Sequence, residues 1–414
     1  MPAAELFDRT ELRAVRRLLP EGSETEPLAA LARTAWSCLT EPGDSVAAAL
    51  IERLGAAEAL AHVVSGSSAA DALTGCGADV DEHAALASGL ERWRPRVDRA
   101  LVQRRLDIAH RLDARLLLPG GPGWPEGLDD LGPHAPLLLW LRGDPAALTA
   151  PLRLALVGAR AATGYGEHVA ADLAAGVAER GGLVVSGGAF GIDAVAHRAA
   201  LGAGGRTVAF LAGGADRLYP TAHSDLLRRI IATPGCAVAT EVPPGTTPTR
   251  WRFLQRNRLI AASAAATVIV EAGARSGSLN TAGHAAALGR PLGAVPGPVT
   301  SASSVGCHRL LREYAAACIT TSSDVLELLG VGDPVEAVTP TVGPESRLVD
   351  ALRGRGSHET DAVARDSGLS VADTLAALGG LLVAGRVDRE ADGRWRLVGA
   401  AHRDDGTGGK AANA

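Results

Sequence analysis

The stretch LVVSGGAFGID, residues 183–193, contains the pattern that decides the fold. An apolar run ends at a serine and glycines, and an alanine-rich helical pattern follows at once. The same order recurs through residues 151–330, and it predicts a parallel sheet covered by helices on both faces. We therefore expect an α/β protein with a Rossmann-like, doubly wound, mostly parallel sheet. Its strands are expected at 152–157, 183–185, 207–211, 236–240, 267–270, 292–295 and 317–319.

The rest of the chain divides around this sheet domain at changes in composition. The expected parts are a charged N-terminal extension at 1–28, a helical domain at 29–115, a structured Pro- and Gly-rich connector at 116–150, a linker at 331–345, a winged helix at 346–398 and a disordered tail at 399–414.

Two helical patterns, Val46–Leu54 and Ala56–Val64, flank the single glycine Gly55. This arrangement is similar to a helix-hairpin-helix, a SAM-like element that clamps nucleic-acid backbones. That motif needs a second glycine, and Ala57 occupies its position. A small helical packing domain is therefore the favoured interpretation, and the helix-hairpin-helix is the alternative.

Composition excludes several classes of protein. The 414 residues are 47% hydrophobic and 21% charged, as in ordinary globular proteins. No apolar run reaches the roughly 18 residues of a membrane span, and the charged N-terminus lacks the apolar core of a signal peptide. The five cysteines are scattered, which argues against a disulfide framework or a cysteine zinc site. We expect a cytoplasmic protein with no membrane partner, no metal site and no cofactor.

Charge is distributed unevenly along the chain, although the net charge is only −5. Residues 151–330 hold 16 basic and 11 acidic side chains, and every basic one is arginine. The segments on either side are both net acidic. A basic domain inside an acidic chain points to a partner that carries phosphates.

The loops that follow the predicted strands carry the residues suited to phosphate. Ligands bind at the carboxyl ends of parallel strands, where helix N-termini present unpaired N–H groups. After the first strand, Gly158 permits close approach and Arg160 can bind a phosphate oxygen. After the second, Ser186, Gly187 and Gly188 are expected to form an anion-binding turn. The expected site continues in this turn with Phe190 and Gly191.

Asp193 and His197 lie four residues apart on the next helix. They could act as an acid–base pair. The alternative, which we favour, is a local helix cap in which the two side chains bond to each other.

The most unusual stretch is TRWRFLQRNRLI, residues 249–260, with four arginines, two aromatic rings and no acid. Arginines at a helix start oppose the helix dipole, so a purely structural helix gains nothing from them there. Guanidinium groups interleaved with rings suit single-stranded nucleic acid, whose phosphates and bases they bind respectively. A further Arg/Gly/Ser loop follows at 271–282.

Residues 150–315 resemble the DprA (Smf) family of DNA-processing proteins. The segments that carry the resemblance are VGARAATGYG, VSGGAFGIDAVAHRAAL, LAGGADRLYP, RNRLIAASAAATVIVEAGARSGSLNTAGHAA and GRPLGAVPG. The resemblance implies an extended Rossmann fold that binds single-stranded DNA, forms a homodimer and loads RecA recombinase during natural transformation. It also implies that Arg160, Arg256 and Arg258 contact DNA and that Phe253 stacks on a base.

Together these arguments predict a binding protein for single-stranded DNA that has no catalytic step. The expected DNA-binding residues are Gly158, Arg160, Ser186, Gly187, Gly188, Phe190, Gly191, Arg250, Arg252, Phe253, Arg256, Asn257, Arg258, Arg275, Ser276 and Gly277. The alternative is a nucleotide-phosphate hydrolase or transferase. Its acid and base would come from Glu241, Glu271, Asp193 or His197.

Overall fold

The computed structural model describes residues 5–74, 79–331, 344–353 and 356–398. The chain forms two compact units, Met1–Asp333 and Pro334–Ala414. Most of the expected linker and the whole expected tail lie outside the described residues.

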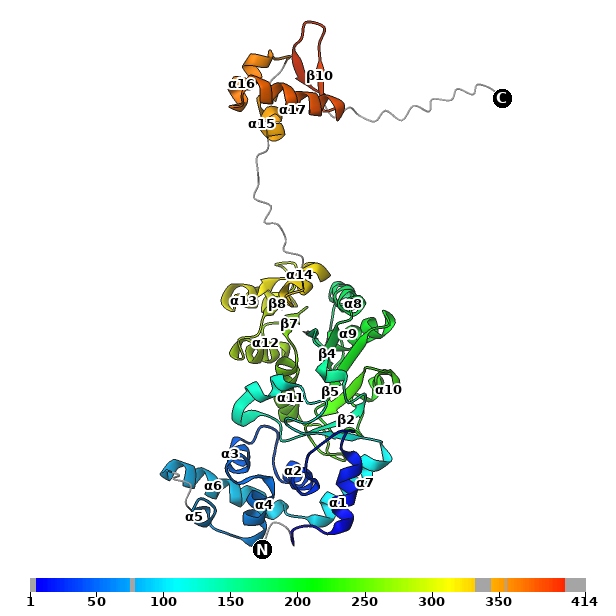
Figure 1. Ribbon diagram of the computed structural model, residues 1–414, viewed down its shortest axis with the longest axis vertical. Helices are drawn as coiled ribbons and strands as arrows, with labels where there is room; N and C mark the ends of the chain where they lie inside the picture. Colours follow the sequence, from blue (N-terminus) through cyan, green and yellow to red (C-terminus); the bar gives the residue numbers. More distant parts are fainter. Residues whose placement is uncertain (1–4, 75–78, 332–343, 354–355, 399–414) are drawn as a thin grey trace, which may run out of the picture. The chain divides into compact units, whose positions relative to one another are not determined.

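The first unit is built on a nine-stranded sheet in the order β1-β2-β6-β5-β4-β3-β7-β8-β9 (Figure 1). The strands β6-β5-β4-β3-β7-β8-β9 are parallel to one another. At one edge, β2 is antiparallel to β6, and β1 is antiparallel to β2. The mostly parallel α/β sheet expected from the sequence is therefore confirmed. The strands are β1 Arg115–Leu117, β2 Leu139–Gly143, β3 Arg153–Val157, β4 Leu183–Gly187, β5 Arg206–Phe210, β6 Ala237–Thr240, β7 Ala266–Ile269, β8 Leu292–Ala294 and β9 Ala317–Cys318.

The order of the strands creates one switch point, between β3 and β7. From β3 the chain builds outward through β4, β5 and β6, and it then returns to β7 on the other side of β3. The loops after β3 and β7 therefore diverge and leave a crevice at the carboxyl ends of these strands.

Helices cover both faces of the sheet because successive strand residues point to opposite sides. Leu154 and Leu156 pack against α8 and α9, whereas Ala155 and Val157 face the core beneath α11 and α12. The helices of this part are α8 Gly164–Glu179, α9 Ile192–Gly202, α10 Ser224–Ala232, α11 Arg250–Ser263, α12 Ser278–Ala287, α13 Val305–Glu313 and α14 Ser322–Leu328.

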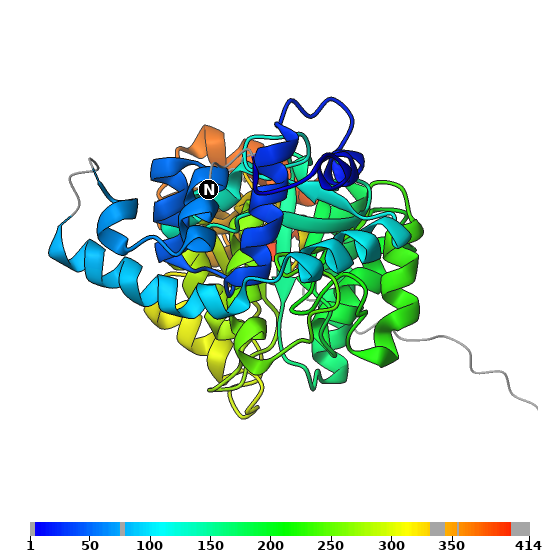
Figure 2. The ribbon, with the colours of Figure 1, turned by 90° about the horizontal axis from the view of Figure 1, so that it is seen from below.

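The N-terminal helices form a layer next to β2 at the antiparallel edge (Figure 1), and Figure 2 shows this layer from below, in front of the sheet domain. Leu116 and Trp140 pack into this layer, and their strand neighbours Leu117 and Leu139 pack into the sheet core. The expected connector thus supplies two edge strands. Val15 of α1 is buried in the same layer, so α1 belongs to it rather than to a separate extension. The helices are α1 Arg9–Leu18, α2 Pro27–Leu39, α3 Ser45–Leu54, α4 Ala56–Ser65, α5 Ala69–Ala72, α6 Val80–Trp93 and α7 Arg99–Arg111.

Helices α3 and α4 meet at Gly55, where φ is +79°. The indole of Trp36, from α2, donates a hydrogen bond to the Ala56 carbonyl at 3.0 Å, and Leu60 is buried against the same core. These contacts support the interpretation of this pair as a packing element.

The second unit contains three helices and a hairpin around a small core of Leu348, Val363, Leu378 and Trp395. The winged-helix assignment stays a prediction. The elements are α15 Pro344–Ala351, α16 Thr360–Ser367, α17 Val371–Val383, β10 Val387–Arg389 and β11 Trp395–Leu397.

No single helix in the described ranges has the length and apolar composition to cross a bilayer, and α16 with α17 reaches that threshold only as a pair bent by 103°.

Candidate functional site

A groove of about 870 Å³ opens at the switch point. It is lined by the loops after β3, β4, β5 and β7 and by the first three turns of α11, so it lies where a doubly wound sheet places its ligand. Gly158, Arg160, Arg250, Phe253, Arg256, Asn257, Arg275, Ser276 and Gly277 of the expected set line it.

Three arginines on the groove are exposed and unpaired. Arg160 and Arg275 come from the loops after β3 and β7, and Arg250 is the first residue of α11. Within the described part of the chain no carboxylate lies in ion-pairing distance of any of them. The acid among the lining residues is Asp193, which is buried. The groove therefore presents a surplus of positive charge to solvent.

Arg256 forms the floor of the groove. Only 6% of it is exposed, and its Nη1 donates to the Phe210 carbonyl at 2.5 Å. Burial lowers the pKa of Arg256 to about 10, and the charge of Asp193 acts against that shift. Arg256 thus stays a cation at neutral pH, held below the ligand space.

Phe253 stands between the cations. The Arg160 guanidinium carbon lies 5.2 Å from the centre of its ring, and that of Arg256 lies 6.0 Å away. The Tyr219 ring is 5.9 Å from the same ring and half exposed. Trp251, two residues before Phe253 at the start of α11, is 56% exposed and lies outside the residues that line the groove. The site therefore combines cations with ring faces.

The turn after β4 does not offer the expected anion nest. Ser186 is buried in the strand, and its hydroxyl donates to the Leu156 carbonyl at 2.6 Å. A Cβ on Gly188 would come 3.0 Å from the Leu211 side chain, so this glycine serves packing. The backbone N–H groups of Ala189 and Gly187 face the Asp193 carboxylate. The Asp193 side chain therefore lies against the donors that the sequence suggested for phosphate.

Two glycines bring the loops of the groove together. A Cβ on Gly158 would lie 2.6 Å from Cγ1 of Ile192. Gly191 has a φ of +73°, and a Cβ there would lie 2.6 Å from the Arg160 carbonyl oxygen. Ile192 also donates its N–H to the Ala159 carbonyl at 3.2 Å. These glycines allow the loops around the groove to approach one another closely.

Glu271 fixes the loop that carries Arg160. Its buried carboxylate accepts hydrogen bonds from the Thr163 N–H at 2.9 Å, the Thr163 hydroxyl at 2.7 Å and the Ser303 hydroxyl at 3.0 Å. The opposite wall is fixed by Asn257, whose amide donates to the Gly277 carbonyl at 3.3 Å. The groove is therefore held by hydrogen bonds on both sides.

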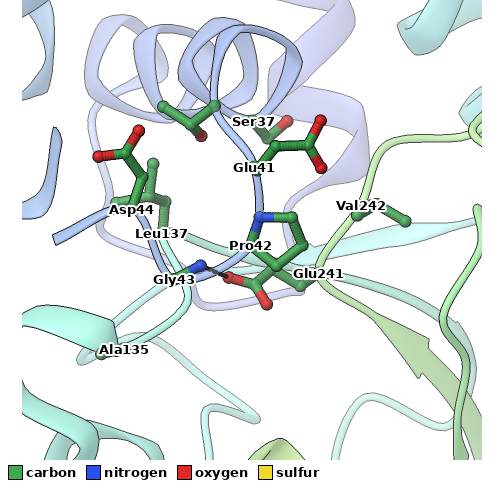
Figure 3. Close-up of a pocket in the computed structure, with 10 residues that line it drawn as sticks. Ser37, Glu41, Pro42, Gly43, Asp44, Ala135, Leu137, Glu241 and Val242 are labelled. Atoms are coloured by element: carbon green, nitrogen blue, oxygen red, sulfur yellow. Dashed lines mark hydrogen bonds between the residues drawn. The ribbon is translucent and has the colours of Figure 1, made fainter. Parts of the chain in front are cut away.

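Arg252 and Arg258 lie outside the groove, contrary to the sequence prediction. Arg252 forms two hydrogen bonds of 3.0 Å with the Glu41 carboxylate. Arg258 is 3% exposed and donates to Glu241 at 2.7 Å. Glu241 also accepts the Gly43 N–H at 3.3 Å (Figure 3). Arg252 thus joins α11 directly to the N-terminal helical layer, and Arg258 does so through Glu241.

Phe190 lies beside the groove, with its ring 4.6 Å from that of His223. Half of Phe190 is exposed, but it does not line the groove. Tyr219 does line it and was missed as a site residue. The signal was present in the sequence, because LAGGADRLYP follows the third predicted strand.

Comparison with known proteins identifies the family. The family model described as DNA recombination-mediator protein A matches residues 115–330, which is half of the chain. The chain belongs to the DNA recombination-mediator protein A family. The match spans β1 to the end of α14 and so contains every residue that lines the groove.

Relatives in the DNA recombination-mediator protein A (DprA, Smf) family cover more of the chain. The putative DNA processing protein DprA of Mycobacterium tuberculosis is 45% identical over 401 residues, which are 91% of this chain and 97% of that protein. Protein Smf of Escherichia coli is 34% identical, over 64% of this chain and 73% of that protein. The X-ray structure of DprA from Streptococcus pneumoniae covers 72% of this chain and 96% of its own, with 28% identity and a TM-score of 0.58.

The acid and base candidates of the alternative enzyme are all engaged in this DprA-family chain. Glu241 and Glu271 hold Arg258 and Thr163, as described above. Burial raises the pKa of Asp193. Burial lowers the pKa of His197 to about 4, and its ring lies 2.6 Å from the Thr207 hydroxyl and 2.9 Å from the Gly187 carbonyl. The local-cap interpretation expected a bond between His197 and Asp193. That expectation is wrong, because both ring nitrogens of His197 contact Thr207 and Gly187 instead.

Proposed function

We propose that the groove binds single-stranded DNA with little dependence on sequence. The observation that carries the proposal is the Arg160–Phe253 pair, in which an unpaired guanidinium lies 5.2 Å from the centre of a ring at the same surface. Phosphates would contact Arg160, Arg250 and Arg275, and a base would stack at Phe253 and Tyr219.

The aromatic faces favour a single strand over a duplex. In a duplex each base is stacked on its neighbours and presents only its edges in the grooves. A single strand can turn a base onto a ring, and every base has a face that stacks. The arginines provide charge and the rings provide stacking, so neither contact selects one base over another.

We further propose that the protein acts in recombination of incoming DNA, protects single strands and transfers them to RecA recombinase as a homodimer. Membership in a family of recombination mediators supports this role. Measuring RecA filament formation on DNA coated by a single-strand-binding protein, with and without this chain, tests it. Equal rates in both reactions would reject RecA loading.

A titration of oligo-dT by length and salt tests the binding proposal. A binding groove gains affinity until the strand is long enough to reach all three exposed arginines, and the salt dependence then reports the number of phosphates contacted. If the protein is instead a nucleotide-phosphate hydrolase or transferase, a mononucleotide should saturate the site. Affinity independent of length, together with release of inorganic phosphate from a nucleotide, would favour the enzyme.

A further inference from the structure

A second polar pocket lies on the far side of the loop that precedes α11. It has a volume of about 300 Å³ and is enclosed by the end of α2, by η2 (Arg94–Arg96) and α7, and by the loop after β6. Its charged lining residues are Glu41, Arg96, Arg105 and Arg252.

The charges of this pocket do not balance. Arg252 and Arg96 share the single carboxylate of Glu41, at 3.0 Å and 3.4 Å. Arg105 makes no hydrogen bond or ion pair with any described residue, and its Nε is buried without a partner. Its guanidinium lies against the backbone of Gly245, where a Cβ would come 2.9 Å from Cζ.

The acidic residues near the pocket already bond to groups other than Arg105. Asp98 pairs with Arg104 at 3.1 Å. Asp216 accepts the Gly245 N–H at 2.6 Å and lies 3.8 Å from Arg217. Neither acid lines the pocket, and neither forms an ion pair with Arg105.

A partly buried guanidinium without an acceptor destabilises the protein unless an anion or ordered water completes its hydrogen bonds. Arginine binds phosphate oxygens through charge-assisted, often bidentate, hydrogen bonds. Thr246 and Thr247 also line the pocket. This chemistry fits a phosphate group.

The position of the pocket connects it with the groove. Thr246 and Thr247 line the pocket, and the next residues, Pro248 and Thr249, line the groove. In the first turn of α11, Arg250 lines the groove and Arg252 lines the pocket, about 200° apart around the helix. A polymer that leaves the groove across this short loop reaches the pocket.

We propose that this pocket, centred on Arg105, is a second phosphate site that binds a backbone phosphate of a DNA strand extending beyond the groove. The inference rests on the proposed function, since the groove must hold the strand first. It assigns to the helical layer a share of DNA binding through α7.

The test compares Arg105→Gln with the wild-type chain on oligo-dT of about 5 and about 20 nucleotides, which bracket usual single-strand site sizes. The variant should bind the short strand as the wild type does and the long strand about tenfold more weakly. Its salt slope on the long strand should fall by about 0.7. Arg104→Gln is the matched control, because Arg104 is exposed on the same helix and already paired with Asp98.

Unchanged long-strand affinity and slope in the variant would overturn the inference while leaving the proposed function intact. A wild type that binds neither strand would reject both. Melting in inorganic phosphate distinguishes a free phosphate ligand. If phosphate stabilises the wild type but not Arg105→Gln, and both bind the long strand equally, the pocket serves a free anion and the DNA inference is wrong.

Arg105→Lys tests whether the effect is purely structural. Lysine keeps the charge, so this variant should retain most of the salt slope. A loss of slope equal to that of Arg105→Gln, with an unchanged melting temperature, would count against a phosphate contact. If Arg105→Gln does not fold, Arg96→Gln removes charge from the same pocket and should show the same dependence on strand length.

Discussion

Gly187 and Arg256 fit each other closely: a Cβ atom on Gly187 would lie 2.6 Å from the guanidinium carbon of Arg256. The glycine ends β4, and the arginine is on α11, so the contact joins a strand to the helix that lines the groove. The sequence suggested that Gly187 admits a phosphate. In the structure the space beside Gly187 is filled by Arg256.

Gly187→Ala should displace Arg256 and with it the ring of Phe253. We expect at least a tenfold loss of oligo-dT affinity, about 1.4 kcal/mol, because the floor of the groove shifts. Fluorescence anisotropy measures the affinity. Gly202→Ala is the control, since nothing lies within 4 Å of a Cβ there, and it should bind normally. Full binding by Gly187→Ala would show that Arg256 has no role in the groove.

Arg160→Ala and Arg275→Ala should each weaken binding and reduce the log–log salt slope by about 0.7, the value for one phosphate on a single strand. Binding isotherms at several salt concentrations provide the slope. Arg228→Ala serves as control because Arg228 is exposed on α10 and pairs with Asp225. Slopes equal to wild type in both groove variants would remove these arginines from the site.

Phe253→Leu should reduce affinity by about 1–3 kcal/mol and leave the salt slope unchanged, because it removes a stacking face and no charge. Trp251 provides a second readout. Among the tryptophans in the described residues it alone is exposed, whereas Trp36, Trp93 and Trp140 are fully buried. Oligo-dT should therefore quench fluorescence in the wild type, and Trp251→Phe should lose that signal. A lower melting temperature with normal affinity for Phe253→Leu would mark the ring as structural.

Stability should fall as pH drops from about 6.5 to about 4 because of His197. Burial holds its folded pKa near 4, below the ordinary value of 6.5, so the unfolded chain binds the proton more tightly in this window. The effect is on the order of 3 kcal/mol for a shift of this size. Urea unfolding across this pH range measures it. His197→Gln should flatten the pH dependence; an identical slope in the variant would assign it to other groups.

Removal of the second unit should have little effect on DNA affinity. Residues 346–398 hold equal numbers of arginines and acids, and α17 carries Asp373 but no lysine or arginine. The negative charge of such a helix would repel DNA phosphates. Its exposed side chains include Val371 and Leu375, which suit contact with protein. A chain ending at Asp333 should bind oligo-dT within tenfold of the full chain, and a larger loss would show that the second unit contacts DNA.

The sequence predicted the sheet well because each strand of a covered parallel sheet is a short apolar run between polar turns. Every expected run overlaps a strand from β3 to β9. Arg160 and Phe253 were also predictable, since strand ends and helix starts locate them at the switch point. The partners of Arg252 and Arg258 were not, because Glu41 and Glu241 come from other elements of the fold. Nor does the pattern of Ser186-Gly187-Gly188 reveal that Arg256 and Asp193 use the space and the donors of that turn.

The antiparallel edge also shapes how the chain folds. Trp140 of β2 pairs with Thr240 of β6, so the β1–β2 pair is synthesised roughly a quarter of the chain before β6 exists. Contacts between such distant residues slow folding and leave an unpaired edge exposed meanwhile. The N-terminal helices pack on Leu116 and Trp140, and they emerge before these strands. They therefore cover one apolar face of the β1–β2 pair before β6 is made, and only the backbone groups of β2 that later pair with β6 stay open.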